Sequence, residues 1–140
     1  ANRFVAGFIG SPAMNFIEAT IVAKEGGYYL EADGFTVQLP HAFSPRVAPY
    51  AGKQVIFGVR PEDVTEHDPA AAGENTLTVR ADVVETLGFE IFAYLTCGVH
   101  PVVARMEVPK TPIEVGQTCE VDMRMDKTHI FDKETSQTIV

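Results

Sequence analysis

Apolar residues along most of this chain recur at every second position, in short runs that end at glycine or proline. The runs occupy residues 14–23, 28–32, 35–39, 54–60, 76–87, 90–97, 101–108, 119–125, 129–132 and 138–140. A period of two interrupted by Gly/Pro turns is typical of short β-strands. About ten such strands indicate an all-β barrel or sandwich. They fit either two barrel-like units or one interleaved pair, divided near residues 68–75.

One segment near the start departs from this period and predicts a helix at residues 2–10. Its apolar positions share one helical face, and Asn2 and Gly10 suit its two ends. These apolar positions are Phe4, Val5, Phe8 and Ile9. A proline-containing break follows, so we expect a linker helix within residues 1–12 and a β-domain at residues 13–140.

The strand at residues 54–60 ends abruptly, because Pro61 has a fixed φ and no N–H for a strand ladder. Proline also suits the first turn of a helix, whose positive N-terminal end favours the carboxylates of Glu62 and Asp63. We therefore expect a one-turn element at about residues 61–64, and then a polar, turn-rich loop up to residue 75.

The formal net charge of −8 restricts the partners that fit this chain. Nucleic acids and anionic lipid headgroups are bound by clustered basic side chains, so the sequence predicts neither partner. No run of ~18 apolar residues exists for a membrane span. The two cysteines, Cys97 and Cys119, lie in apolar or alternating stretches and are interpreted as buried thiols. Since the chain begins without Met or a signal peptide, we expect it to be a fragment of a longer protein.

The sequence carries no motif for catalysis, metal binding or cofactor binding. It lacks the G-x-x-x-x-G-K-[ST] phosphate loop, an L-S-G-G-Q-like signature and the G-x-S-x-G nucleophile elbow. Metal-ligand spacing is also missing among the histidines. These are His41, His67, His100 and His129. We therefore expect that this chain is not an enzyme and neither binds nor hydrolyses ATP.

Four segments are more specific than the strand pattern. Residues 2–16 read NRFVAGFIGSPAMNF, residues 58–62 GVRPE, residues 84–90 VETLGFE and residues 129–135 HIFDKET. In this order they resemble the segments N-x-F-V-A-x-F-I-G-S-P-x-M-N, G-[IV]-R-P-E, V-E-x-L-G-x-E and H-x-F-D-x-x-T-G. These belong to the ATPase subunits of carbohydrate-type ABC importers, the maltose and glycerol-phosphate class. Ser136 replaces the glycine of the last pattern, and the polar loop before residue 76 is unmatched.

The resemblance implies a C-terminal regulatory domain built of OB-like β-barrels, called TOBE, that follows a nucleotide-binding domain in the same polypeptide. ATP and Mg would then be bound in that missing motor domain. The implied partners are the motor domain, a second copy of the subunit, the permease subunits and a regulatory protein. The implied location is the cytoplasmic face of the inner membrane, and the implied cargo is a sugar or sugar-like solute.

Six residues in or beside these segments are candidate contacts with a partner or a second copy: Arg60, Glu62, Gly88, Phe89, Glu90 and Phe131. Arg60 could bind a partner carboxylate with its planar fork or form an ordinary salt bridge at a strand end. Gly88 is interpreted as a bulge between two strands that exposes Phe89 and re-aims the following strand toward a partner. We expect weak self-association through such surfaces.

Two other functions compete with this interpretation. A small-ligand sensor is one, since related barrels of other transporters bind oxyanions. The net charge of −8 and the lack of an S-A-R-N-like motif oppose anion binding. An independent enzyme is the other, which the missing catalytic motifs oppose.

Overall fold

The computed structural model describes residues 14–70, 75–110 and 112–140. Over these residues the protein is built from antiparallel strands, with one short α-helix and a few 3-10 turns, which confirms the all-β prediction. The expected helix at residues 2–10, with its stripe of Phe4, Val5, Phe8 and Ile9, lies outside the described residues. The division into residues 1–12 and 13–140 therefore stays a prediction.

The first sheet, sheet A, has five antiparallel strands in the order β10-β4-β1-β2-β3. Their bounds are β1 (Asn15–Lys24), β2 (Gly27–Ala32), β3 (Phe35–Gln38), β4 (Gln54–Val59) and β10 (His129–Asp132). Three short helical turns join β3 to β4. They are η2 (His41–Phe43), α1 (Ser44–Val47) and η3 (Ala48–Tyr50).

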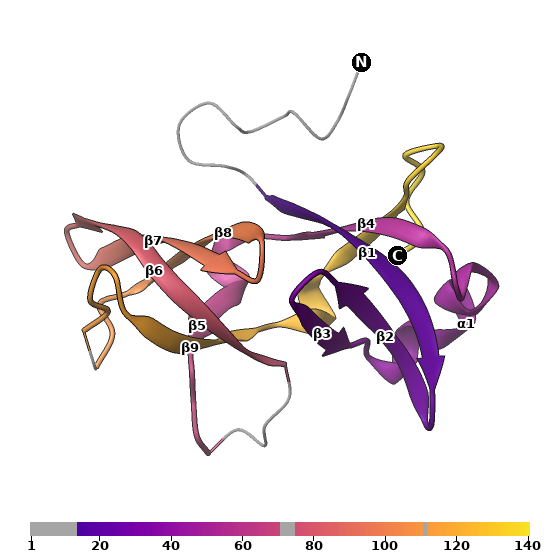
Figure 1. Ribbon diagram of the computed structural model, residues 1–140, viewed down its shortest axis with the longest axis horizontal. Coiled ribbons are helices and arrows are strands. Elements are labelled where there is room, and N and C mark those ends of the chain that lie inside the picture. The colour runs from indigo at the N-terminus through magenta and orange to yellow at the C-terminus, as the bar shows by residue number, and fades with distance from the viewer. Residues whose placement is uncertain (1–13, 71–74, 111) are drawn as a thin grey trace.

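The second sheet, sheet B, also has five antiparallel strands, in the order β5-β9-β6-β7-β8. Their bounds are β5 (Val64–Glu66), β6 (Thr76–Leu87), β7 (Glu90–Cys97), β8 (His100–Glu107) and β9 (Thr118–Met123). Figure 1 shows the two sheets side by side along the long axis of the molecule, with sheet B on the left.

The two sheets have the same topology, and each takes its fifth strand from the chain that leaves the other. Strand β5 follows β4 in sequence but pairs with β9, whereas β10 follows β9 but pairs with β4. Each crossing begins at an arginine and contains one 3-10 turn. These are Arg60 before η4 (Pro61–Asp63), and Arg124 before η5 (Met125–Lys127). The protein is therefore an interleaved pair, divided at these crossings rather than near residues 68–75.

Strict alternation builds the core, because successive side chains of a strand point to opposite faces of the sheet. Along β7 every second residue is buried, from Ile91 to Cys97. The buried side chains of both sheets form one continuous cluster. Its fully buried members include Ile21, Leu30, Phe57, Val79, Leu95 and Val102. Each such side chain contributes about 1.5–3 kcal/mol relative to an exposed one.

Two parts of the strand prediction were wrong and one turn was confirmed. The loop expected after residue 64 begins with a strand, β5, because residues 64–66 pair with β9. The strand expected at residues 138–140 is reduced to one bridge between Thr138 and Phe131, with the tail bonded to Ile130. The one-turn element after Arg60 is confirmed as η4.

Two hairpin tips, one from each sheet, touch at the joint. A Cβ placed on Gly34, between β2 and β3, would lie 2.4 Å from the Cα of Gly98, between β7 and β8. Both glycines have positive φ, of 107° and 62°. Only glycine combines this conformation with so close a backbone approach.

Two asparagine side chains fasten the same joint, each bonded to an edge strand of the opposite sheet. Asn15 of β1 accepts a hydrogen bond from the Val103 N–H (2.8 Å) and donates one to the Val103 carbonyl (2.9 Å). Asn75, just before β6, accepts one from the Gln38 N–H (2.8 Å) and donates one to the Gln38 carbonyl (3.2 Å). A side-chain amide thus replaces a strand neighbour at each edge, which satisfies backbone groups that would otherwise be unpaired.

Candidate interaction surfaces

Phe89 lies at the tip of the β6–β7 hairpin and is 90% exposed. Leu87 pairs with Glu90, so Gly88 and Phe89 form a two-residue turn. A positive φ of 65° at Gly88 suits the first position of a type II′ turn. The prediction of a bulge at Gly88 was therefore wrong, since the bulge of this hairpin lies between Ala81 and Val83. The expected exposure of Phe89 is confirmed.

The hairpin tip surface consists of Phe89, Leu87 and Val108, with Glu85 and Glu90 beside them. Leu87 and Val108 are 55% and 58% exposed, and the Val108 N–H donates to the Phe89 carbonyl at 3.1 Å. Glu85 accepts a hydrogen bond from the Tyr94 hydroxyl at 2.7 Å, and Glu90 pairs with Arg105 at 3.2 Å. An exposed aromatic side chain with apolar neighbours and a polar rim has the composition of a protein contact.

Phe131 lies in sheet A, on the edge strand β10. Its ring meets the ring of Phe16 edge-on, with centroids 6.1 Å apart and planes at 62°. Phe131 also stands opposite Ile56 of β4, and all three side chains are half-buried. Phe131 therefore belongs to an aromatic and aliphatic patch on the outer face of sheet A, well away from the hairpin tip.

Arg60 and Glu62 lie together at the crossing from sheet A to sheet B, and both are exposed. Among the described residues Arg60 makes no ion pair within 4.0 Å, so the expected strand-end salt bridge does not form. Its charge still acts on Asp63, which is only 8% exposed. Burial raises the pKa of Asp63, Glu62 raises it further, and Arg124 and Arg60 oppose this rise.

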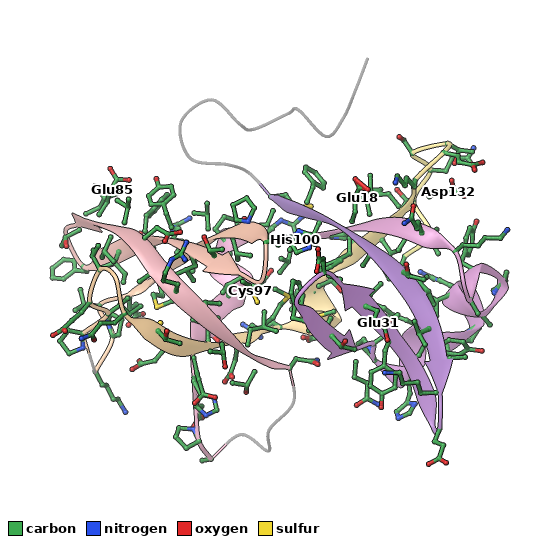
Figure 2. All side chains as sticks on the ribbon, in the orientation of Figure 1. Glu18, Glu31, Glu85, Cys97, His100 and Asp132 are labelled. Carbon is green, nitrogen blue, oxygen red and sulfur yellow. The ribbon has the colours of Figure 1, made fainter. Side chains whose placement is uncertain are left out.

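The six candidate residues thus fall into three separate groups. Gly88, Phe89 and Glu90 form one, Arg60 and Glu62 another, and Phe131 the third. Figure 2 shows Glu85, on the hairpin that carries Phe89, toward one end of the long axis and Asp132, at the end of β10, toward the other. Both side chains lie on the upper side of the molecule in this view. A single copy cannot bring the two ends into contact.

A cleft of about 710 Å³ lies between the two sheets, and no sequence pattern predicted it. Asn75 and Asp122 line it, and near them stand Glu66, Asp68, Asp126, Arg124 and His41. Asp122 is the most bonded of these groups. Burial acts to raise its pKa, but hydrogen bonds from the Asp68 N–H, the Thr76 hydroxyl and His67 outweigh this and lower the pKa.

Neither a metal centre nor a reactive thiol is found in the described part of the chain. No cluster of three or more His, Cys, Asp or Glu side chains there is arranged to hold a metal ion. Cys97 is buried and Cys119 half-buried, and burial raises the pKa of both thiols. Cys119 of β9 stands opposite Val79 of β6, and Cys97 ends β7, the strand on the other side of β6. That places their Cα atoms about two strand spacings apart, ~9–10 Å, too far for a disulfide.

None of the described helices has both the length and the apolar character needed to cross a bilayer.

Two interleaved five-stranded antiparallel sheets with the same topology define a fold of the OB-like class. Residues 10–64 match the MalK OB fold domain family, and residues 57–131 match the TOBE domain family. The second match alone covers more than half of the chain. The chain belongs to the TOBE domain family, as the resemblance in its sequence implied.

Similar full-length proteins are ATP-binding subunits of ABC transporters. The trehalose/maltose import ATP-binding protein MalK of Thermococcus litoralis is 38% identical over 99% of this chain and 38% of its own length. The multiple sugar-binding transport ATP-binding protein MsmK of Streptococcus mutans is 36% identical over 99% of this chain and 37% of its own. An ABC transporter ATP-binding protein of Bacillus subtilis, YurJ, is 32% identical. The chain spans less than two fifths of the length of these relatives.

The fold recurs in a protein of different sequence. The cytoplasmic molybdate-binding protein ModG, solved with molybdate bound, superposes with a TM-score of 0.65 at 17% identity, over 83% of this chain and 94% of ModG. At this identity the likeness is one of fold alone.

Proposed function

We propose that this chain is the C-terminal regulatory and dimer-contact domain of the ATP-binding subunit of an ABC importer for a sugar or sugar-like solute. The observation that carries the proposal is the pattern of coverage. Two sugar-transport ATP-binding proteins match 99% of this chain but only 37–38% of themselves. The remainder of such a subunit holds the ATPase machinery, which agrees with the missing phosphate loop. The subunit works at the cytoplasmic face of the inner membrane, and its partners are permease subunits, a second copy and a regulatory protein.

Two copies pair with their long axes antiparallel. In a two-fold pair, residue i of one copy meets residue j of the other, and residue j of the first meets residue i of the second. The hairpin tip around Phe89 belongs to sheet B and the patch around Phe131 to sheet A, so the two surfaces lie in different halves of the molecule. An antiparallel pair therefore places the hairpin tip of each copy against the Phe131 patch of its partner. Arg60 and Glu62, which lie at the crossing between the sheets, are further candidate contacts of this pair.

The chain by itself is expected to show a concentration-dependent monomer–dimer equilibrium in sedimentation equilibrium runs. In the full transporter the motor domains and permease raise the effective concentration of the two copies, and the isolated chain lacks this help. Phe89→Ala should weaken the dimer by roughly tenfold, the usual effect of removing an aromatic anchor. Val115→Ala removes a comparably exposed side chain (61%) from another loop and is the matched control.

Two other results would each contradict a different part of the proposal. A dimer that tolerates Phe89→Ala as well as Val115→Ala would show that another surface makes the contact. A strictly monomeric chain at high concentration would remove the dimer-contact part of the proposal and leave its regulatory part.

Purified chain is expected to bind no nucleotide in isothermal titration calorimetry with Mg-ATP up to millimolar concentration. The physical reason is that no glycine-rich backbone cradle with its lysine is present to hold the phosphates. Heat of binding at micromolar affinity would contradict the assignment of ATP binding to the missing part of the subunit.

A small-ligand sensor remains the competing proposal, but no feature of the site favours it. The cleft between the sheets carries four carboxylates, those of Glu66, Asp68, Asp122 and Asp126, and these repel oxyanions. A ligand that binds only the folded chain raises its thermal midpoint by mass action. A rise with molybdate or with a sugar would therefore favour sensing over the assembly role.

A further inference from the structure

A compact polar network lies beside the cleft, where the chain leaves β5 and enters β6. The Asp122 carboxylate of β9 is at its centre. One of its oxygens, Oδ1, lies 2.8 Å from the His67 ring Nδ1 and accepts a hydrogen bond from the Thr76 hydroxyl at 2.7 Å. The other oxygen accepts a bond from the Asp68 N–H at 2.9 Å. The side chains of His67 and Asp122 are 25% and 18% exposed, so water screens their interaction only in part.

This network adjoins one of the two asparagine clamps that join the sheets. Thr76 directly follows Asn75, whose side chain holds both backbone groups of Gln38 in sheet A. The Asn75 carbonyl in turn accepts a bond from the N–H of Met123, the residue after Asp122. Asp122 is therefore connected to Asn75 by two short routes, one through Thr76 and one through Met123. The other clamp, from Asn15 to Val103, has no histidine among its hydrogen-bond partners.

We propose that protonation of His67 tightens the clamp between Asn75 and Gln38, so that the joint between the two sheets responds to pH near neutrality. The protonated ring donates a charge-assisted hydrogen bond to the Asp122 carboxylate, which is shorter and stronger than one from a neutral ring. Asp122 then holds Thr76, and with it the backbone that carries Asn75. Deprotonation weakens this support without breaking any strand pairing. The device goes beyond the role in assembly and does not depend on it.

The charges that face His67 fix the direction of the response. The hydrogen bond to Asp122 is the largest influence on His67 and raises its pKa; burial opposes this rise, and the charges of Asp122, Glu120 and Asp68 add to it, so the net shift is upward. A histidine whose pKa is higher in the folded than in the unfolded chain stabilises the fold below its unfolded value of about 6.5. That contribution is lost as the pH rises through the higher folded value. The lowered pKa of Asp122 keeps this carboxylate ionised throughout the same range.

Amide hydrogen exchange measured by NMR from pH 6 to 8.5 tests the proposal in the whole chain. The Gln38 amide reports on the Asn75 clamp, and the Val103 amide, bonded to Asn15 at the same distance of 2.8 Å, is the internal reference. We expect the ratio of the Gln38 to the Val103 protection factor to fall by roughly threefold or more as the pH rises, the scale of a partly exposed ion pair. The midpoint should coincide with the ring titration of His67.

Two variants test whether His67, rather than another histidine, causes the pH response. His67→Gln should make the ratio independent of pH, at the value of the wild type at high pH. His41→Gln alters the exposed histidine that lines the cleft and should leave the wild-type response intact. A ratio that stays constant with pH in the wild type would overturn the proposal, and this result needs no variant to fold. A pH response of the ratio that persists in His67→Gln would also overturn the proposal.

Discussion

Replacing Gly98 by alanine is expected to destabilise the fold by about 2–4 kcal/mol, because the new methyl group has no space at the joint between the sheets. Its Cβ would lie 2.5 Å from the Asp33 carbonyl oxygen and 2.7 Å from the Gly34 Cα. Both atoms belong to the backbone of a hairpin tip, which cannot turn aside as a flexible side chain can. The positive φ of 62° adds the strain of a left-handed conformation to this clash.

Urea denaturation of Gly98→Ala and Gly26→Ala distinguishes the two contributions. Gly26 also lies in a hairpin turn with a positive φ, of 76°, but a Cβ there meets nothing within 4 Å. Its replacement should therefore cost only the backbone strain, about 1 kcal/mol. Equal losses for the two variants would mean that the contact between the hairpin tips does not hold the sheets together.

The strands could be predicted because a strand pattern is local. Along β7, Ile91, Ala93, Leu95 and Cys97 alternate with exposed or half-buried residues, and Gly98 ends the run. Gly34 and Gly98 were both predicted as turns for the same reason. The contact between the two turns depends on how the sheets pack against each other. No sequence pattern within either hairpin predicts this contact.

The sequence also did not show that the two sheets have the same topology, because equivalent positions in the two halves carry different residue types. Arg60 and Arg124 begin equivalent crossings, yet Pro61 and Glu62 follow the first and Met125 and Asp126 the second. Many different apolar residue types fit each inward position of an antiparallel sheet, so two sheets of the same topology need not have similar sequences.

Of the candidate contacts, the exposure of Phe89 could be predicted, since a glycine before an aromatic residue between two strand patterns marks a turn. The contact roles of Arg60, Glu62 and Phe131 stay predictions. The asparagine clamps were missed, although a signal existed for one of them. Asn15 lies on the same face of β1 as the buried residues Ile17, Ala19 and Ile21. A polar side chain on this inward face needs hydrogen-bond partners.

Asn15→Ala is expected to destabilise the fold by about 2–4 kcal/mol, comparable to the loss at Gly98. The side chain is 7% exposed and holds both the N–H and the carbonyl of Val103. Removing it leaves two partly buried backbone groups without this partner, each at a cost of about 1–3 kcal/mol. Chemical denaturation at pH 7 measures the loss directly.

Asn15→Asp tests whether the two hydrogen bonds are the cause. An ionised carboxylate accepts the bond from the Val103 N–H but faces the Val103 carbonyl with no proton to donate, so the variant should be at least as unstable as Asn15→Ala at pH 7. Burial and the carbonyl oxygen both disfavour this charge and raise the pKa of the introduced carboxyl above its unfolded value of about 3.9. As the pH falls through the raised value, the neutral acid can donate to the carbonyl, and the deficit of Asn15→Asp relative to wild type should shrink. Asn15→Ala adds no titrating group, so its deficit relative to wild type should stay nearly constant over the same pH range. Parallel pH profiles for the two variants would show that packing around Asn15, rather than its hydrogen bonds to Val103, fastens this side of the joint.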